Sequence, residues 1–440
     1  MASINRRSFV KSSVAVGAGT LFLPTSLRSN PSPNETFQLA QIGCGRMGTG
    51  DMTNALYFGS KKGVNARVVA VCDVDSKRSE KARDIVEAFY SNKPEASSKV
   101  QTYGDYRELL SRPDIDGVII STPDNWHGLI GIAAASAGKH IYMQKPLTYS
   151  IPEGQALVKA VRKNKVILQT GAQQRSSVYF RQVCTIIRNQ WLGKLKEIQV
   201  ELPTDGGKCF GKPEPVPSTL NYDMWLGPCP EVPYIEACVH SQSVTNGRPG
   251  WLQIERHCLG NVTGWGSHMY DIAQWAMGTD ADSGPIEVRS KGDFPDRGHY
   301  NVHCKYDGEA LYANGVRMTS KSGKAGVNFI CENGWAYCTR DSMKCSDPEL
   351  LRRKPVNSEV TLYNSSDHMG NFITSAQNNA EPISPVEVGH RTNTICVLHH
   401  ISMKLAGRPI KWDPEKEVPI GDPEVEKMIQ VPMRKPYSLS

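Results

Sequence analysis

Over the first 170 residues, short apolar runs alternate with segments in which apolar positions recur at helical spacing. The apolar runs predict strands at 37–42, 67–72, 117–121, 140–143 and 166–170. The helically spaced segments between them predict helices at 76–88, 129–137 and 152–164. Strands and helices that alternate in this way are typical of βαβ units, so this part is predicted to form an α/β fold, a Rossmann-type doubly wound parallel sheet.

The pattern changes beyond residue 176. A helix is predicted at 178–189, followed by longer runs in which apolar and polar residues alternate at 197–202, 286–290, 300–306, 311–318 and 327–332. Such alternation predicts a large, mostly antiparallel sheet with one open face. Residues 203–260 are dense in Pro, Gly and Cys and are interpreted as an irregular wall of the active site.

These patterns divide the chain into three parts. Residues 1–35 are interpreted as a signal and linker, residues 36–170 as a nucleotide-binding domain, and residues 171–440 as a C-terminal α/β domain. A helix predicted at 385–406 and the tail after it are expected to return to the first domain.

The N-terminal segment resembles a twin-arginine export signal. Arg6 and Arg7 are followed by Phe9 and Lys11, and then by an uncharged run of small and apolar residues at 12–24. The alternative is a basic start to a cytoplasmic chain. The signal predicts a periplasmic protein, either free or tethered at its N-terminus, and no later run is apolar enough to predict a membrane span.

Charge and cysteine usage narrow the function. The net charge of +7 over 440 residues comes from basic residues interleaved with acidic ones, without a basic stripe, so no nucleic-acid partner is expected. The twelve cysteines form no CxxC pair and no zinc-type spacing, so no metal is expected. Cys209, Cys229, Cys238 and Cys258 crowd one irregular region, where both free thiols and a disulfide remain open.

A glycine motif follows the first predicted strand. Gly43, Gly45 and Gly48 form GxGxxG with Arg46 and Met47 between the last two glycines, a pattern in which backbone approaches a pyrophosphate at a helix N-terminus. Asp73 ends the second strand, where a carboxylate binds the ribose hydroxyls of NAD. Lys77 and Arg78 follow closely, so NADP stays open. The alternative is a tight turn with Asp73 as a helix cap.

Two further strand ends carry polar residues. After the strand at 117–121, Thr122, Pro123, Asn125 and His127 are expected to contact the cofactor, although Asn125 and His127 could instead cap a helix near residue 128. After the strand at 140–143 comes Gln144-Lys145-Pro146, where Lys145 either serves the chemistry or extends from the sheet edge to water.

The order of these signals resembles the Gfo/Idh/MocA oxidoreductases, relatives of glucose-fructose oxidoreductase and inositol dehydrogenase. The resemblance spans residues 36–435 and includes the segments 173–175, 225–228 and 264–275. It implies that Lys145 lies between nicotinamide and substrate, with Gln144 at the cofactor in place of the usual Glu and with a cis bond to Pro146. It also implies a homodimer or homotetramer.

The resemblance implies further site residues. His268 matches a proton-relay histidine, but Gly264 replaces the aspartate four residues before it, and Asp271 is the candidate to take that part. Loss of the Glu before Lys145 is expected to lower the pKa of this lysine. Weaker candidates for substrate contacts are Gln174, Arg175, Tyr179, Trp225 and His257.

The resulting prediction is an exported oxidoreductase that transfers a hydride between tightly bound NAD and a hydroxyl of a sugar, cyclitol or glycoside. Tight binding is expected because free nicotinamide nucleotide is scarce outside the cytoplasm. One alternative is a redox-assisted glycosidase or lyase that passes through a transient keto sugar. Another is a sugar-binding protein without catalysis.

Overall fold

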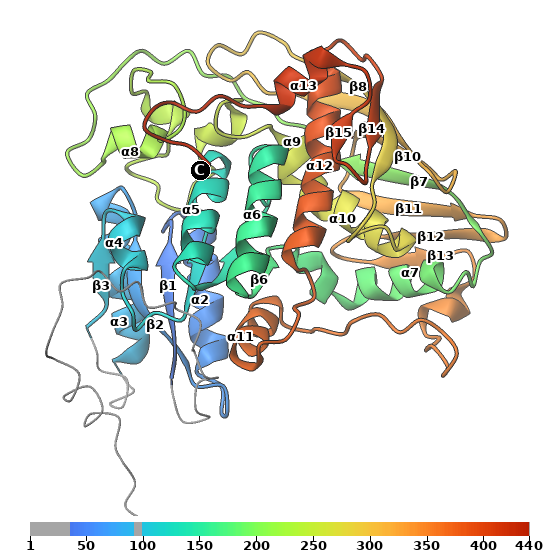
Figure 1. The fold of residues 1–440 in the computed structure, drawn as a ribbon, viewed down its shortest axis with the longest axis horizontal. Coiled ribbons are helices and arrows are strands. Elements are labelled where there is room, and N and C mark those ends of the chain that lie inside the picture. Colours follow the sequence, from blue (N-terminus) through green and yellow to red (C-terminus); the bar gives the residue numbers. More distant parts are fainter. Residues whose placement is uncertain (1–35, 92–98, 440) are drawn as a thin grey trace, which may run out of the picture.

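The computed structural model describes residues 36–91 and 99–439, which form two sheets with their helices (Figure 1). The twin-arginine segment lies outside the described residues. The first sheet has the order β3-β2-β1-β4-β5-β6, and its strand pairs are parallel. Its strands are β1 (Phe37–Ile42), β2 (Ala66–Cys72), β3 (Gln101–Tyr103), β4 (Gly117–Ile120), β5 (His140–Met143) and β6 (Leu168–Thr170). This order is that of the Rossmann fold and confirms the predicted fold class.

Helices connect these strands. They are α2 (Arg46–Gly59), α3 (Ser76–Tyr90), α4 (Tyr106–Leu110), α5 (Asp124–Ser136) and α6 (Ile151–Asn164). Side chains cap several of their first turns: Asp75 accepts from Lys77 N at α3, and Ser150 accepts from Glu153 N at α6. Every residue of β4 is buried, as expected for a parallel strand covered by helices on both faces.

The second sheet has nine strands in the order β13-β12-β11-β7-β10-β9-β8-β14-β15. Only its β7–β10 pair is parallel, so the predicted mostly antiparallel sheet is confirmed. The strands are β7 (Leu195–Leu202), β8 (Pro285–Asp293), β9 (Lys305–Tyr312), β10 (Arg317–Ser322), β11 (Gly326–Cys331), β12 (Gly334–Cys338), β13 (Met343–Cys345), β14 (Ile410–Asp413) and β15 (Val418–Pro419).

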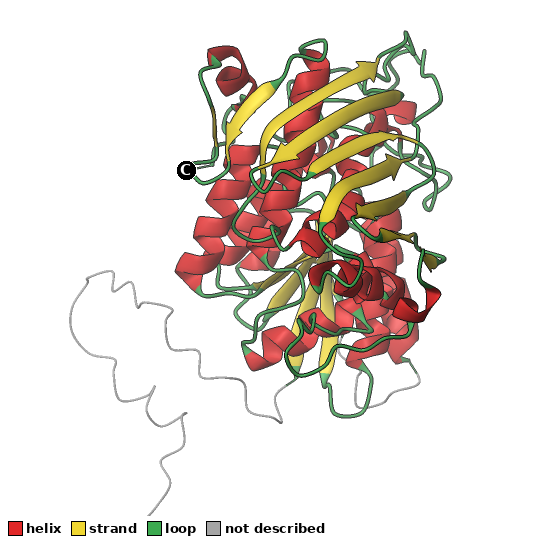
Figure 2. Cartoon of the chain, turned by 90° about the vertical axis from the view of Figure 1, so that its right-hand side faces the viewer, coloured by secondary structure: helices red, strands yellow, loops and turns green. Residues whose placement is uncertain are grey.

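Helices cover one face of this sheet, and Figure 2 shows the other face turned toward the viewer. The covering helices are α7 (Val178–Arg188), α10 (Gly266–Met277) and α12 (Val386–Lys404). In β7, Ile198, Val200 and Leu202 are buried toward the helices, whereas the residues between them stay at least partly exposed. Helix α12 also lies against α6, which joins the two halves (Figure 1).

The remaining helical turns lie between these elements. They are η2 (Gln173–Ser176), α8 (Tyr222–Leu226), η3 (Glu236–Cys238), η4 (Gly250–Gln253), α9 (Asn261–Gly264), η5 (Pro348–Leu351), α11 (His368–Asn378) and α13 (Pro423–Ile429). Short helical turns are thus the main regular structure of the insertion between β7 and α9, as expected for an irregular wall.

Three predicted elements were placed wrongly. The run at 311–318 is not one strand, because Asn314 and Gly315 form a turn between β9 and β10, with Gly315 at φ +83°. The strand predicted at 300–306 begins only at Lys305. Helix α5 begins at Asp124 rather than near residue 129, because Pro123 precedes it and an acid in the first turn suits the helix dipole.

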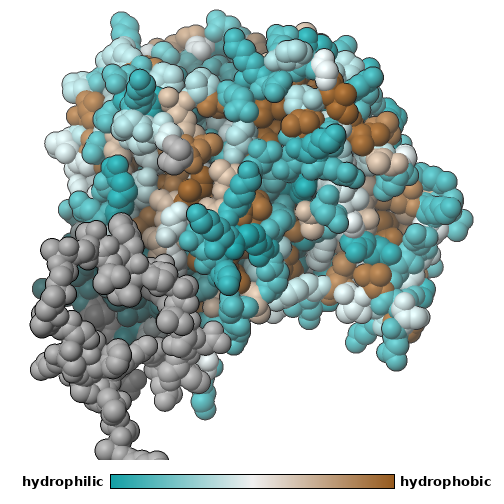
Figure 3. Space-filling model, in the orientation of Figure 1, coloured by the Kyte–Doolittle hydropathy of each residue, from teal (hydrophilic) through white to brown (hydrophobic). Residues whose placement is uncertain are grey.

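None of the described helices is long and apolar enough to cross a membrane. On the face drawn in Figure 3, hydrophobic residues are interspersed with hydrophilic ones where the surface is coloured.

Candidate functional site

A cavity of about 590 Å³ lies at the carboxyl ends of the Rossmann strands. This is the edge where open α/β sheets bind ligands, and the volume is within the usual range for such sites. The Rossmann side contributes Gly43, Gly45, Arg46, Met47, Asp73, Arg78, Thr122, Pro123, Asp124, Gln144, Lys145 and Pro146. The C-terminal side contributes Gln174, Trp225, His240, Gly247, Arg248, Cys258, Asn261, Gly264, Trp265, His268 and Arg340, among others.

The glycine loop forms one end of this cavity. Gly43 has φ +85°, and a Cβ there would lie 2.7 Å from the Ser121 backbone, so only glycine fits. A Cβ on Gly48 would overlap the Gly43 carbonyl, and Gly48 serves the packing of α2 rather than lining the cavity. No side chain caps the first turn of α2, so its N–H groups remain for an anionic ligand.

Asp73 lies beside this loop. Its carboxylate accepts from Cys44 N at 2.7 Å and from Asp75 N at 2.9 Å, and it also lines the cavity. The alternative role as a helix cap is excluded, because Asp75 caps α3. The glycines, the uncapped helix and this strand-end carboxylate fit the pyrophosphate and ribose of a dinucleotide.

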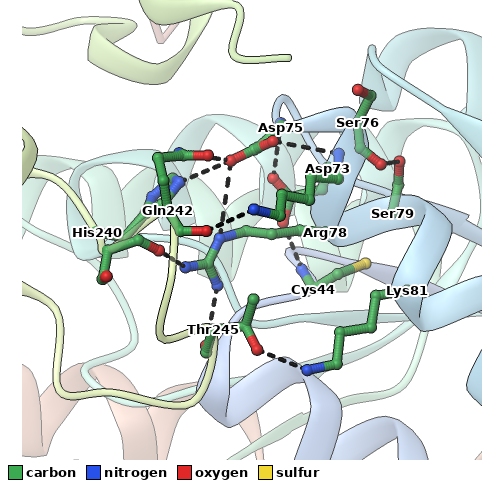
Figure 4. Close-up of polar contacts among 12 residues, drawn as sticks. Cys44, Asp73, Asp75, Ser76, Arg78, Ser79, Lys81, His240, Gln242 and Thr245 are labelled. Atoms are coloured by element: carbon green, nitrogen blue, oxygen red, sulfur yellow. Dashed lines mark hydrogen bonds and ion pairs between the residues drawn. The ribbon is translucent and has the colours of Figure 1, made fainter. Parts of the chain in front are cut away.

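A segment of the insertion closes over the same end (Figure 4). We call residues His240–Arg248 the strap. The Asp75 Oδ2 atom lies 3.0 Å from His240 Nε2 and accepts from Gln242 Nε2 at 2.9 Å. Burial alone would raise the pKa of Asp75, but hydrogen bonds from His240, Gln242 and Thr219 hold it below its ordinary value.

Three basic side chains of α3 hold the strap from the other direction. Lys77 donates to the Gln242 carbonyl, and the buried Arg78 donates to the carbonyls of Ser241 and Thr245, both at 3.3 Å. Lys81 donates to the Thr245 hydroxyl. Lys77 and Arg78 are the cations that could have bound the 2′-phosphate of NADP. Both already donate hydrogen bonds to the strap.

Lys145 lines the cavity. Its bond to Pro146 is cis, as the resemblance implied, and its backbone N–H donates to the Gln144 side chain. Burial lowers the pKa of Lys145, while the nearby Asp124 and Cys258 act in the opposite direction. The pKa is therefore lowered, as expected, but burial is the main cause.

The missing Glu before Lys145 is replaced by a two-residue arrangement. The Gln144 amide donates to both carboxylate oxygens of Asp51 on α2, at 3.1 and 2.9 Å. Burial raises the pKa of Asp51 to about 6, and Lys145 is among the groups that lower it. A carboxylate therefore remains near Lys145, displaced from position 144 to Asp51.

Asp124 also lines the cavity and was not among the predicted site residues. It opens α5 and is buried, and its Oδ2 atom has no hydrogen-bond partner among the described residues. Burial raises the pKa of Asp124 to about 7, whereas Lys145 and the Cys258 thiol lower it. An amine whose pKa is lowered by burial and a carboxyl whose pKa is raised to about 7 therefore face one cavity.

His268 and Gln174 complete the polar lining near Lys145. Burial lowers the pKa of His268 well below its ordinary value, and its Nδ1 atom has no partner among the described residues. Neither amide atom of the buried Gln174 has one. Unpaired buried polar atoms are costly, so these groups are suited to bind a polar ligand.

Two predicted site residues are bound to each other instead of lining the cavity. Asp271 forms a two-point ion pair with Arg175, at 2.8 and 2.7 Å, and Arg175 also pairs with Asp280. The Arg175–Asp271 pair is buried behind the cavity wall. Asp271 therefore does not replace the aspartate missing at Gly264, and Arg175 is not free to recognise substrate.

Four more candidates lie outside the lining. Asn125 donates to the Leu226 carbonyl, and the ring nitrogens of His127 contact the carbonyls of Pro146 at 2.7 Å and Thr122 at 3.0 Å. His127 thus supports the turn that carries Lys145. His257 packs against Trp225, with ring centroids 4.6 Å apart, and Tyr179 does not line the cavity either.

Several residues of the cavity lining were not predicted, because they come from parts of the chain that are far apart in the sequence. Asp124 belongs to the same strand-end segment as Asn125 and His127, but α5 was predicted to begin after it, so the place of Asp124 in the first turn was not expected. Cys258, Trp265 and Arg340 join the cavity from the insertion, the loop before α10 and the turn after β12. No local pattern distinguishes such residues from others of the same kind.

The described cysteines are free thiols, so no disulfide links Cys209, Cys229, Cys238 or Cys258. Cys209 and Cys238 nevertheless lie with their sulfur atoms 3.6 Å apart. Among residues 36–91 and 99–439, no group of three His, Cys, Asp or Glu side chains could hold a metal ion.

Fold and site together define a dinucleotide-dependent oxidoreductase, and comparison with known families agrees. Residues 37–172 match the oxidoreductase family with an NAD-binding Rossmann fold, and residues 204–439 match the C-terminal α/β domain of the same family. The chain belongs to the Gfo/Idh/MocA oxidoreductase family.

Curated relatives match parts of the chain. Glycosyl hydrolase family 109 protein 1 of Shewanella sp. (strain ANA-3) is 29% identical over 180 residues, covering 38% of each chain. Myo-inositol 2-dehydrogenase of Thermotoga maritima is 28% identical over 157 residues, covering 36% of this chain and 42% of the relative. The chain thus matches well under two thirds of the length of these relatives.

Solved structures share the fold over most of the chain at low sequence identity. The WlbA dehydrogenase from Bordetella pertussis, solved with NADH and UDP-GlcNAcA, has a TM-score of 0.61 at 15% identity, covering 86% of this chain and 99% of that one. The aldose-aldose oxidoreductase from Caulobacter crescentus has a TM-score of 0.56 at 15% identity, covering 86% and 100%.

Proposed function

We propose that this protein transfers a hydride between tightly held NAD and a hydroxyl of a sugar, cyclitol or glycoside. The observation that carries the proposal is the shared cavity, in which the glycine loop and Asp73 lie at one end and Lys145, Asp124 and His268 line the same space. When bound, the nicotinamide supplies the hydride acceptor or donor.

Lys145 acts on the proton of the reacting hydroxyl. Burial lowers its pKa and so favours the neutral amine, which accepts this proton during oxidation and, as the ammonium, returns it during reduction. Asp124, beside it, stabilises the resulting ammonium when ionised. Gln174 and His268 have unpaired polar atoms with which to bind further hydroxyls of the substrate.

The strap supports tight retention. It closes over the Asp73 end of the cavity and is held by hydrogen bonds to Asp75, Lys77, Arg78 and Lys81. A cofactor beneath it leaves only when these hydrogen bonds open. NAD is favoured over NADP because the Asp73 carboxylate repels a 2′-phosphate, while Arg78 is already engaged.

Redox-assisted glycoside cleavage is the second candidate. Relatives named as glycosyl hydrolase family 109 proteins favour it, as does the α-N-acetylgalactosaminidase of Shewanella oneidensis, which is 32% identical over 173 residues, covering 35% of this chain and 36% of the relative. In that case the same Lys145 serves oxidation, elimination and reduction in one closed cycle.

Two measurements test these functions. Denaturation of the protein as purified should release NAD in near-equal amount, detected by mass spectrometry, and its absence would refute tight retention. The intact protein is then mixed with p-nitrophenyl glycosides without added NAD. Release of nitrophenol selects glycoside cleavage, whereas accumulation of a keto sugar with an added acceptor selects net oxidoreduction.

Export through the twin-arginine pathway is part of the proposal and rests on Arg6, Arg7 and the apolar run that follows. A reporter fused behind residues 1–35 should reach the periplasm, and replacement of both arginines by lysine should keep it in the cytoplasm. Transport that survives this replacement would refute the route.

We also propose that the open face of the second sheet packs against another copy of the chain. Trp335 lies on this face and is 40% exposed. Sedimentation should show a dimer or tetramer, and a monomer at micromolar concentration would refute the proposal.

A further inference from the structure

Arg340 reaches the cavity from the second sheet. It lies in the turn between β12 and β13, where Thr339 N donates to the Ser342 carbonyl and the Thr339 hydroxyl accepts from the N–H groups of Asp341 and Ser342. Of the residues that line the cavity, Arg340 alone comes from the described part of this hairpin. A structured turn therefore presents this guanidinium to the site.

Trp265 supports the guanidinium on one side. The Arg340 guanidinium carbon lies 4.5 Å from the centroid of the Trp265 ring, and Trp265 in turn packs against His268, with ring centroids 5.9 Å apart. Stacking on an aromatic face orients the planar group and leaves its N–H donors for another partner. Arg340, Trp265 and His268 form a continuous row along the cavity wall.

No carboxylate among the described residues pairs with Arg340 within 4 Å. The contrast is Arg248, another arginine of the lining, whose guanidinium pairs with Asp205 at 2.7 Å. The Arg340 side chain is exposed at the cavity, and its partial burial lowers its pKa, an effect that the neighbouring Asp341 offsets only in part. The guanidinium thus lines the cavity without a protein anion to balance its charge.

The positive charge of Arg340 affects the pKa values of Lys145 and His268. Burial is the main cause of the lowered pKa of both Lys145 and His268, and the positive charge of Arg340 contributes to each. Asp124 and Asp51 are the acids whose charges act on Lys145, and burial raises the pKa of Asp124 to about 7 and that of Asp51 to about 6. Arg340 therefore offers the cavity a positive charge that the reaction of a neutral sugar hydroxyl does not require.

We propose that Arg340 binds an oxyanion on the substrate, so that the protein acts on an acidic carbohydrate in preference to a neutral one. The planar guanidinium suits two-point binding of a carboxylate, as in a uronic acid, and equally of a sugar phosphate. This inference rests on the proposed function, since it assigns the substrate class of the same cavity.

The test uses the purified protein with its bound dinucleotide and matched pairs of probes. The pairs are glucose with glucuronate and galactose with galacturonate, together with methyl glucuronate as a neutral analogue and glucose 6-phosphate as the phosphate arm. Two readings are taken: the near-ultraviolet absorbance of the reduced nicotinamide, and ligand binding by calorimetry. The variants are Arg340→Gln, Arg340→Lys and, as control, Arg352→Gln, which removes an exposed arginine outside the cavity.

At least one acid should bind the wild type roughly ten- to hundredfold more tightly than its neutral partner, as expected for hydrogen bonds to a charged group. Arg340→Gln should abolish this ratio, Arg340→Lys should retain part of it, and Arg352→Gln should leave it unchanged. A preference for glucose 6-phosphate alone would assign the oxyanion as a phosphate.

The two proposals fail in different ways. If neutral sugars bind as well as the acids, if the preference survives in Arg340→Gln, or if no acid binds, the inference about Arg340 is overturned. If acids bind through Arg340 but no carbohydrate changes the absorbance of the dinucleotide, the inference stands and the proposed hydride transfer is overturned.

Discussion

The strap offers a direct test of cofactor retention through the single change Asp75→Asn. Asp75 Oδ1 caps α3 by accepting from Lys77 N at 3.2 Å, while Oδ2 holds His240 and Gln242. Asparagine keeps the capping oxygen and the shape, and asparagine is as good an N-cap as aspartate. Its amide nitrogen, however, cannot accept the hydrogen bonds that His240 and Gln242 make to Oδ2 of the carboxylate.

The size of the expected effect follows from the two hydrogen bonds that the substitution removes. Hydrogen bonds to a buried charged acceptor contribute about 1.5 kcal/mol each at the low end of their range, so removing two lowers the cost of opening the strap by about 3 kcal/mol. At 1.4 kcal/mol per factor of ten, the bound dinucleotide should dissociate roughly a hundredfold faster.

The assay follows release of the dinucleotide by rapid desalting and by the fluorescence of its reduced form. Asp105→Asn is the matched control, because Asp105 caps α4 in the same way, accepting from Arg107 N, and does not contact the strap. Dissociation from Asp75→Asn at the wild-type rate, with the fold intact by circular dichroism, would refute the role of the strap.

Three further predictions concern other parts of the molecule. Because ionised Asp124 stabilises the ammonium of Lys145, the rate of oxidation should increase as the pH rises through about 7. Asp124→Asn should remove this limb of the pH–rate profile and lower kcat on the order of 10²-fold. An unchanged limb in the variant would exclude Asp124 as the group that titrates. Burial lowers the pKa of His303 from 6.5 to about 3, so between pH 6.5 and 5 His303 takes up a proton only in the unfolded chain. The free energy of unfolding, measured with urea, should therefore fall by about 2 kcal/mol over this range. His303→Phe should lose this pH dependence, and an equal fall in the variant would contradict the assignment. Oxidised glutathione should accept the electrons of the Cys209 and Cys238 thiols and leave these two residues joined by a disulfide. The disulfide should raise the free energy of unfolding by about 3–4 kcal/mol. Peptide mapping that finds either cysteine unmodified, or joined to Cys229 or Cys258, would contradict this prediction.

Local pattern predicted much of the fold because the core strands are short and apolar. The strand predicted at 37–42 coincides with β1, and the helix predicted at 385–406 contains α12 within two residues at each end. Strand β3 was missed because it has three residues, of which Gln101 and Thr102 are exposed, so no apolar run marks it. In the second sheet, the turn at Asn314 and Gly315 was overlooked within an alternating run.

The site was predictable where one motif carries it. Lys145 and His268 were placed in the cavity because each follows a recognisable pattern next to a strand end or within a helix. Arg175 and Asp271 were misassigned because their ion pair joins residues 96 positions apart, and the strap contacts Asp75 across 165 positions. Such contacts depend on tertiary packing, which no local spacing encodes.

Lys145 is expected to act on a carbohydrate that is held beside the dinucleotide in one cavity. The most direct test compares the wild type with Lys145→Met in a single turnover, following reduction of the bound dinucleotide after mixing with a substrate. The variant should retain its dinucleotide in full but reduce it roughly a hundredfold more slowly. Reduction by the variant at the wild-type rate would show that Lys145 takes no part in the hydride transfer.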